Sequence, residues 1–191
     1  MLVAGRSAPL HCVAEEGLLL LNRLGIWLIG ERCRIGAFST IGEGVVIGDD
    51  VTIGANVTLQ NSTVGSQVVI HPGVRIGQDG FGFMLDASGE HAKKPQELRV
   101  EIHDHVEIGA NSTIDRGSWR DTVIGKGCKL DNLVGVAQHL QIGDNVRIAA
   151  KSGVMNHLES NATYGGSPAV PIMEYRRQMA YLRRLGKKSV E

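Results

Sequence analysis

Residues 34–59 read RIGAFSTIGEGVVIGDDVTIGANVTL, and an aliphatic residue returns at every sixth position, usually followed by glycine. The period extends over most of the chain, with a one-residue slip after Leu59 and two longer interruptions. The repeating positions are Ile29, Ile35, Ile41, Ile47, Ile53, Leu59, Val64, Ile70, Ile76, Ile102, Ile108, Ile114, Ile124, Leu130, Val136, Ile142, Ile148 and Val154. A period of six is neither helical nor that of a simple alternating strand, and it is typical of hexapeptide β-helices.

The repeat also predicts how the core is built. Three hexads form one triangular coil, in which each repeating side chain points inward and stacks on its equivalent in the next coil. The small residue that follows it lets the backbone turn. Such a stack needs few aromatic residues, in agreement with the 3 Phe, 2 Trp and 3 Tyr among 191 residues. We predict an all-β fold, a parallel β-helix (hexapeptide-repeat solenoid) followed by a C-terminal α-helix.

Charge and cysteine content exclude several classes of protein. The 20 basic and 20 acidic residues give a net charge of zero, so no overall charge favours nucleic acid or an anionic membrane. The apolar run at residues 17–21 is too short for a membrane span and lacks a basic leader. The 3 cysteines have no metal-ligand spacing and are odd in number, so no disulfide framework is expected. We expect a cytoplasmic protein without a membrane span.

The repeat divides the chain into three parts. Residues 1–28 are expected to form a cap, a short helix or strand at one end of the core. Residues 29–164 form the solenoid, interrupted by loops at 78–99 and 115–121. Residues 165–191 form a linker and a basic amphipathic helix. Because loops that leave a rigid solenoid commonly carry binding groups, the two loops are the candidate functional regions.

Several motifs within and beside the loops indicate which family of hexapeptide-repeat proteins the sequence resembles. The runs Ile76–Phe83 and Glu107–Gly117, the Lys93…Pro95-Gln96 element and Asp131-Asn132 resemble the UDP-3-O-(3-hydroxyacyl)glucosamine N-acyltransferase family. These LpxD-like hexapeptide-repeat acyltransferases act in the synthesis of lipid A, the anchor of lipopolysaccharide. The resemblance implies a left-handed solenoid and a homotrimer with active sites between subunits. It also implies acyl transfer from acyl carrier protein, as co-substrate, to the amine of a nucleotide-linked amino sugar, without cofactor or metal.

The sequence departs from that family at two points. The family has a uridine-binding domain before the solenoid, and the 28 residues here are too few for one. In addition, Gln138 stands where the family's catalytic histidine would lie, seven positions after Asp131, and the next residue is His139. We interpret this as the loss of a whole number of coils, joined in register near Val134, because a solenoid tolerates such a loss.

The expected active site centres on His139. As a general base, it would take a proton from the sugar amine, with Asp131 as its orienting group, or it is a surface histidine at a coil corner. Gln138 can orient a substrate but cannot relay a proton. The expected substrate-binding residues are Gln138, Asp79, Phe81, Phe83, Lys93 and Gln96.

Alternatives remain open at these positions. Phe81 and Phe83 would line an acyl groove or anchor the first loop to the solenoid wall. Lys93 would hold phosphate or be a solvated lysine. Zinc bound by His71, His103 and His105 is a weaker interpretation, because His103 and His105 would point to opposite faces of a strand.

The C-terminal helix, expected from Ile172 to Leu185, is strongly basic. Arg183 and Arg184 would contact acyl carrier protein, an acidic partner, or the helix would pack around a threefold axis. A rival to the enzyme is an inactive trimeric paralogue that keeps the scaffold or a surface that binds the carrier protein. Gln138 favours the rival, whereas retention of both loops favours the enzyme.

Overall fold

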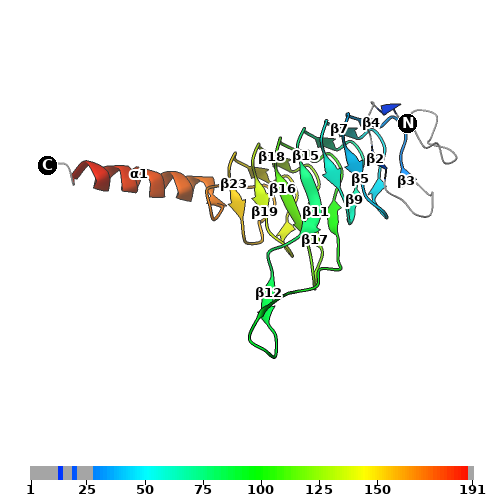
Figure 1. Ribbon diagram of the computed structural model, residues 1–191. Helices are drawn as coiled ribbons and strands as arrows, with labels where there is room; N and C mark the ends of the chain where they lie inside the picture. Colours follow the sequence, from blue (N-terminus) through cyan, green and yellow to red (C-terminus); the bar gives the residue numbers. More distant parts are fainter. Residues whose placement is uncertain (1–12, 15–18, 21–27, 189–191) are drawn as a thin grey trace.

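The computed structural model describes residues 13–14, 19–20 and 28–188, and side chains from 28 to 185. The chain forms a parallel β-solenoid with one C-terminal helix (Figure 1). The first sheet contains β1 (Val13–Ala14), β4 (Arg34–Ile35), β7 (Thr52–Ile53), β10 (Val69–Ile70), β15 (Glu107–Ile108), β18 (Lys129–Leu130), β21 (Arg147–Ile148), β23 (Thr163–Gly165) and β24 (Val170–Pro171). The second contains β2 (Leu19–Leu20), β5 (Thr40–Ile41), β8 (Thr58–Leu59), β11 (Arg75–Asp79), β16 (Thr113–Arg116), β19 (Gly135–Val136) and β22 (Gly153–Val154). The third contains β3 (Leu28–Ile29), β6 (Val46–Ile47), β9 (Ser62–Val64), β14 (Val100–Ile102), β17 (Thr122–Ile124) and β20 (Gln141–Ile142).

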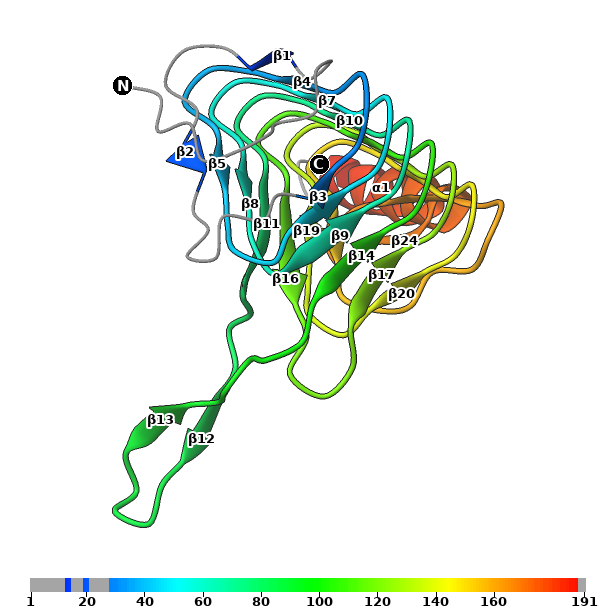
Figure 2. The same ribbon diagram turned by 90° about the vertical axis from the view of Figure 1, so that its right-hand side faces the viewer.

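Each regular coil is 18 residues long. Arg34 pairs with Thr52 in the first sheet, and Thr40 pairs with Thr58 in the second. Viewed from the N-terminal end in Figure 2, the chain passes from β7 to β8 to β9 counterclockwise while it recedes from the viewer. The solenoid is therefore left-handed, as the family resemblance implied.

The core is the aliphatic stack that the sequence predicted. The hexad aliphatics from Ile35 to Val154 are all buried, and Ile29 is partly buried. A second buried layer lies two residues before these positions, as at Val51, Val106 and Cys128. The period-six pattern missed this layer, which arises because residues i and i+2 of a strand share a face. Burial raises the pKa of the Cys128 thiol to about 11, so this cysteine is a packing residue; Cys12 lies outside the described residues.

The glycines of the hexads have a different purpose from the one predicted. The residue with positive φ at a turn lies three positions after the inward aliphatic and is usually not glycine, as at Asn56 (57°), Leu133 (61°) and His139 (67°); glycine holds this position only at some turns, such as Gly44 and Gly73. The glycine instead gives the next coil room. A Cβ on Gly109 would lie 2.5 Å from the carbonyl carbon of Asp131, closer than side chains approach a backbone.

Three further elements leave or extend the coils. The first loop forms an antiparallel hairpin of β12 (Phe83–Leu85) and β13 (His91–Lys93), which projects from the solenoid (Figure 2). Helix α1 (Ile172–Lys188) packs on β23 and β24 and continues past the last coil (Figure 1). No helix of the described residues is long and apolar enough to cross a membrane. Of the expected cap, β1 and β2 pair with β4 and β5, and residues 1–12, 15–18 and 21–27 lie outside the described residues.

Candidate active site

Both loops leave the solenoid at one corner, between the second and third sheets. The hairpin follows β11, the 115–121 loop follows β16 in the next coil, and the corner of the coil after that holds Gln138 and His139. The two loops are fastened together, since Leu98 N–H donates to Gly117 O at 3.0 Å and Arg99 N–H donates to Asp121 Oδ1 at 2.7 Å. The fold therefore places the candidate loops and His139 at one surface.

Asp79 is the centre of a charge cluster at the base of the hairpin. Lys93 Nζ lies 2.7 Å from Asp79 Oδ2, and Arg116 Nε lies 2.8 Å from Asp79 Oδ1. The hydrogen bond from Lys93, together with Arg116, lowers the pKa of the Asp79 carboxyl. The structure thus brings the predicted residues Asp79 and Lys93 together, and Lys93 is paired rather than free. Arg116, which the sequence analysis did not select, completes the cluster.

Two carboxamides meet beneath the hairpin. Gln96, only 3% exposed, donates from Nε2 to Gln138 Oε1 at 2.8 Å, and Gln96 Oε1 is buried without a hydrogen-bond partner in the described structure. Beside them, Gln78 Nε2 donates to Asp115 Oδ1 at 2.7 Å. Burial raises the pKa of the Asp115 carboxyl above its usual value. The structure therefore brings the predicted residues Gln96 and Gln138 together.

His139 is held by the 115–121 loop. Its backbone N–H donates to Thr122 Oγ1 at 2.9 Å. Its ring Nδ1 lies 3.3 Å from both Ser118 N and Arg120 O, and its Nε2 lies 3.3 Å from Ser118 Oγ. The Trp119 ring lies 4.9 Å from the imidazole, centroid to centroid, and the Arg120 guanidinium lies over the indole. His139 is thus a fixed member of the corner and not an isolated surface side chain.

Asp131 is not among the hydrogen-bond partners of His139 in the described structure. Its Oδ1 accepts hydrogen bonds from Asn132 N at 2.7 Å and Asn132 Nδ2 at 3.1 Å. Asp131 follows β18 of the first sheet, whereas His139 follows β19 of the second, so the two residues occupy successive corners of the coil. Within one chain, the predicted orientation of His139 by Asp131 is therefore corrected: Ser118 and Arg120 orient the ring.

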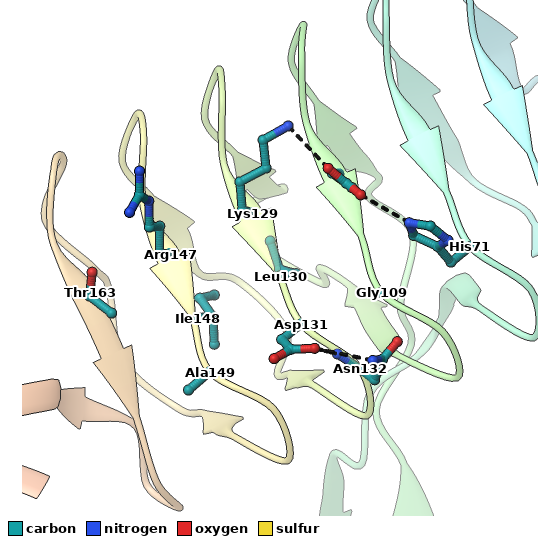
Figure 3. Close-up of a pocket in the computed structure, with 11 residues that line it drawn as sticks. His71, Gly109, Lys129, Leu130, Asp131, Asn132, Arg147, Ile148, Ala149 and Thr163 are labelled. Carbon is teal, nitrogen blue, oxygen red and sulfur yellow. Dashed lines mark hydrogen bonds and ion pairs between the residues drawn. The ribbon is translucent and has the colours of Figure 1, made fainter. Parts of the chain in front are cut away.

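Asp131 instead borders a hollow of about 540 Å³ on the face of the first sheet (Figure 3). There, Glu107 lies 3.0 Å from His71 Nε2 and 3.4 Å from Lys129 Nζ. The hydrogen bond from His71 is the main cause of the lowered pKa of the Glu107 carboxyl. Among the residues that the structure describes, no three His, Cys, Asp or Glu side chains are grouped so as to hold a metal ion.

The aromatic pair of the first loop is exposed. Phe81 is 93% exposed and Phe83 is 47% exposed, and their rings contact each other edge to face at 4.9 Å. Phe81 therefore does not anchor the hairpin to the wall of its own solenoid. Arg183 and Arg184 are likewise exposed, on the part of α1 that extends past the coils (Figure 1).

The sequence analysis missed Ser118, Trp119 and Arg120 as neighbours of His139. The sequence did contain one signal for their role, because these residues lie in the second of the two interruptions of the repeat. Their contact with His139 spans about 20 positions and depends on the stacking of one coil on the next. Knowledge of the 18-residue coil would have placed the two segments at the same corner.

Comparison of the sequence with known protein families indicates the class of protein. The family described as "Bacterial transferase hexapeptide (six repeats)" matches residues 28–61 and 121–156. Together with the left-handed solenoid, this match shows that the repeats of the chain are of the bacterial transferase hexapeptide type.

Within that class, the chain is similar to curated UDP-3-O-acylglucosamine N-acyltransferases. One from Methylorubrum extorquens is 42% identical over 168 residues, which cover 69% of this chain and 48% of the relative. Another, from a Methylobacterium species, is 41% identical over 164 residues, covering 67% of this chain and 46% of the relative. The chain spans about half the length of the curated relatives it matches.

The first of these alignments is longer than the part of this chain that it matches. It spans 168 residues but uses 69% of the 191 residues here, about 132, so about 36 positions of the relative have no counterpart in this chain. That difference equals the length of two coils of 18 residues. The loss of whole coils near Val134 stays a prediction.

Solved structures support the fold alone. AntD, an N-acyltransferase from Bacillus cereus in complex with dTDP and 3-hydroxybutyryl-CoA, has a TM-score of 0.55 at 20% identity, covering 91% of this chain and 88% of that one. WeeI from Acinetobacter baumannii AYE has a TM-score of 0.52 at 18% identity, covering 82% of this chain and 55% of that one.

Proposed function

We propose that this protein is an acyltransferase that moves an acyl chain from acyl carrier protein to the amine of a nucleotide-linked amino sugar, in a pathway of the lipid A type. The observation that carries the proposal is the corner where both loops meet the fixed imidazole of His139. The names of the curated relatives support the reaction class and the acceptor.

The chemistry needs a base and an oriented acceptor. His139 takes a proton from the sugar amine while the nitrogen attacks the thioester carbonyl; the C–N bond forms, the C–S bond breaks, and the thiolate takes up the proton. A neutral imidazole can accept a proton in this way at neutral pH. The thioester is already activated, so no further cofactor is required.

The carboxamides and the hairpin supply the binding surface in this proposal. Gln138 is fixed by the buried Gln96 and is itself only partly buried, so it is the carboxamide of the two that a substrate can reach. Exposed Phe81 and Phe83 offer an apolar wall for the acyl chain when a neighbouring subunit of a homotrimer covers them. Arg183 and Arg184 offer positive charge to the acidic carrier protein.

The second candidate is an inactive trimeric paralogue that keeps the scaffold or the surface for the carrier protein. One observation favours it. Gln138, in the register of the family's catalytic histidine, is tied to Gln96 at 2.8 Å and cannot relay a proton.

Steady-state acyl transfer separates these candidates. With acyl carrier protein as donor and UDP-linked amino sugars as acceptors, His139→Ala is expected to lower kcat/KM by roughly 10²- to 10⁴-fold, the usual contribution of a general base. His103→Ala, at an exposed corner, is the matched control. A wild type without turnover that gains activity on Gln138→His would favour the inactive paralogue. Unchanged turnover in His139→Ala would show that His139 is not the base.

A further inference from the structure

His157 occupies the same corner of its coil that His139 occupies in the coil before it. It follows the inward Val154 by three positions, as His139 follows Val136, and these two valines are paired across neighbouring strands. His157 is exposed, and so is Arg120 of the loop after β16, whose Nη1 lies 3.4 Å from His157 Nε2. The Arg120 side chain therefore reaches past the coil of His139 to the next coil of the same corner.

The contact between Arg120 and His157 places two hydrogen-bond donors face to face. Gln141 N–H donates to His157 Nδ1 at 2.9 Å, so Nδ1 is an acceptor and the proton of the neutral imidazole lies on Nε2. The guanidinium of arginine has only donors. His157 Nε2 and Arg120 Nη1 therefore cannot hydrogen-bond to each other, and an acceptor placed between them would satisfy both.

The charge of Arg120 indicates that this acceptor is an anion. Among the described residues, no carboxylate forms an ion pair with the guanidinium, whose contacts are His157 and the indole of Trp119. The neighbouring carboxylate of Asp121 accepts a hydrogen bond from Arg99 N–H instead. The indole lies 4.6 Å from Arg120 Cζ, centroid to carbon, and restricts the position of the guanidinium without offering it a lone pair.

We propose that Arg120 and His157 form a subsite for a phosphate group, and that this phosphate is the one next to the sugar in the nucleotide-linked acceptor. Phosphate offers negative charge and several acceptor oxygens, and arginine binds it with paired N–H donors. The identity of the acceptor rests on the proposed function. The subsite itself rests on the two facing donors.

The position of the subsite favours the acceptor over the carrier protein as the source of the phosphate. Successive coils are stacked at the spacing of neighbouring strands, about 4.8 Å, so His157 lies one such step from His139 along the corner. In a nucleotide-linked 2-amino sugar, the first phosphate is only a few bonds from the amine that His139 deprotonates. In phosphopantetheine, the whole pantetheine arm separates the phosphate from the thioester.

The first test measures binding to the full chain by isothermal titration calorimetry, with UDP-glucosamine and 4′-phosphopantetheine as separate ligands. Arg120→Gln removes the positive charge, and we expect it to raise the Kd for UDP-glucosamine by roughly 10- to 100-fold, as for the loss of hydrogen bonds to a charged group. The Kd for phosphopantetheine should not change. Arg34→Gln, at an exposed position of β4 on the first sheet, removes the same charge and is the matched control.

Two substitutions of His157 separate a ligand contact from a structural one. In His157→Asn, the amide oxygen can replace Nδ1 and keep the bond from Gln141 N–H, but no donor remains at the position of Nε2. In His157→Gln, the amide nitrogen can reach the position of Nε2, and the acceptor for Gln141 is lost. We expect His157→Asn to raise the Kd for UDP-glucosamine about 10-fold with unchanged urea unfolding, and His157→Gln to stay within about threefold of wild type. The reverse order would show that His157 acts through Gln141, and would overturn its place in the subsite.

The remaining outcomes separate this inference from the proposed function. Arg120-dependent binding of UDP-glucosamine, without acyl transfer to any amino sugar, supports the subsite and rejects the proposed function. Acyl transfer with an unchanged KM for the nucleotide sugar in Arg120→Gln rejects the subsite and leaves the proposed function standing. An effect of Arg120→Gln on phosphopantetheine alone overturns the assignment to the acceptor. Equal affinities of Arg120→Gln and wild type for both ligands, or binding of neither by the wild type, overturn the inference as a whole.

Discussion

At the scale of single residues, the corner positions decide where functional groups lie. His139 adopts a left-handed backbone, with φ of 67°, because it occupies the turn position that closes the coil after the inward Val136. The turn fixes its backbone, and the loop of the preceding coil then fixes its ring. The residues that support a side chain at such a corner therefore come from the same corner of the neighbouring coil, and not from its sequence neighbours.

Asp131→Asn tests this rule. Asp131 borders the hollow on the first sheet, and an asparagine oxygen can still accept the hydrogen bond from Asn132 N. We therefore expect acyl-transfer turnover within about twofold of wild type and a change in unfolding free energy within about 0.5 kcal/mol, as for most surface substitutions. A loss approaching that of His139→Ala, with the fold intact by circular dichroism, would show that Asp131 reaches the active site, for example across a subunit boundary.

At the scale of elements, the hairpin is held to the solenoid by charge and by backbone hydrogen bonds. It projects with mostly exposed side chains, and Asp79 at its base binds Lys93 of β13 and Arg116 of β16. Because the hairpin carries Phe81 and Phe83, this cluster determines where these two rings are presented. Positioning of the hairpin is therefore sensitive to the ionisation of Asp79.

The pH dependence of this anchor has a defined sign. The pKa of Asp79 is lower in the folded protein than in the unfolded chain, so its ion pairs stabilise the fold at pH values above about 4, the ordinary carboxyl pKa. That contribution is lost as pH falls further, through the lowered pKa. We expect Asp79→Asn to destabilise the protein in urea unfolding at pH 6 and the difference from wild type to shrink below pH 4. A difference that stays constant from pH 6 to pH 3 would exclude the charge as its cause.

At the scale of the whole molecule, the solenoid is a one-dimensional stack. Each coil contacts mainly its neighbours, so a solenoid can lose entire coils without breaking its core. The same architecture leaves apolar groups uncovered at its corners and on its helix. Exposed examples are Phe38, Phe81, Leu133, Met155, Met173, Tyr181, Leu182 and Leu185. Association with further copies of this chain would cover those of the hairpin and of α1.

We expect a homotrimer on this ground. The light-scattering mass at micromolar concentration should be about three times the 20.5 kDa of one chain. Leu182→Glu places a charge on the exposed apolar side of α1 and should weaken association. Ala180→Glu, at another exposed position of the same helix, adds the same single negative charge and is the control. A wild-type mass of one chain would rule out the trimer and leave the hairpin aromatics without a neighbouring subunit to cover them.

The sequence by itself determined the solenoid, its core and the place of its two loops. The inward aliphatic recurs within six residues, so the pattern is local and every repeat reports the same geometry. Tertiary structure decided the membership of the site. Gln96 meets Gln138 across 42 positions, and Gln78 meets Asp115 across 37, contacts that exist because one coil stacks on the next. Asp131 and His139 are only eight positions apart, yet the turn between their strands carries them to different corners. Proximity in a solenoid follows the 18-residue coil, and separation in the sequence is therefore a poor guide to which side chains can act together.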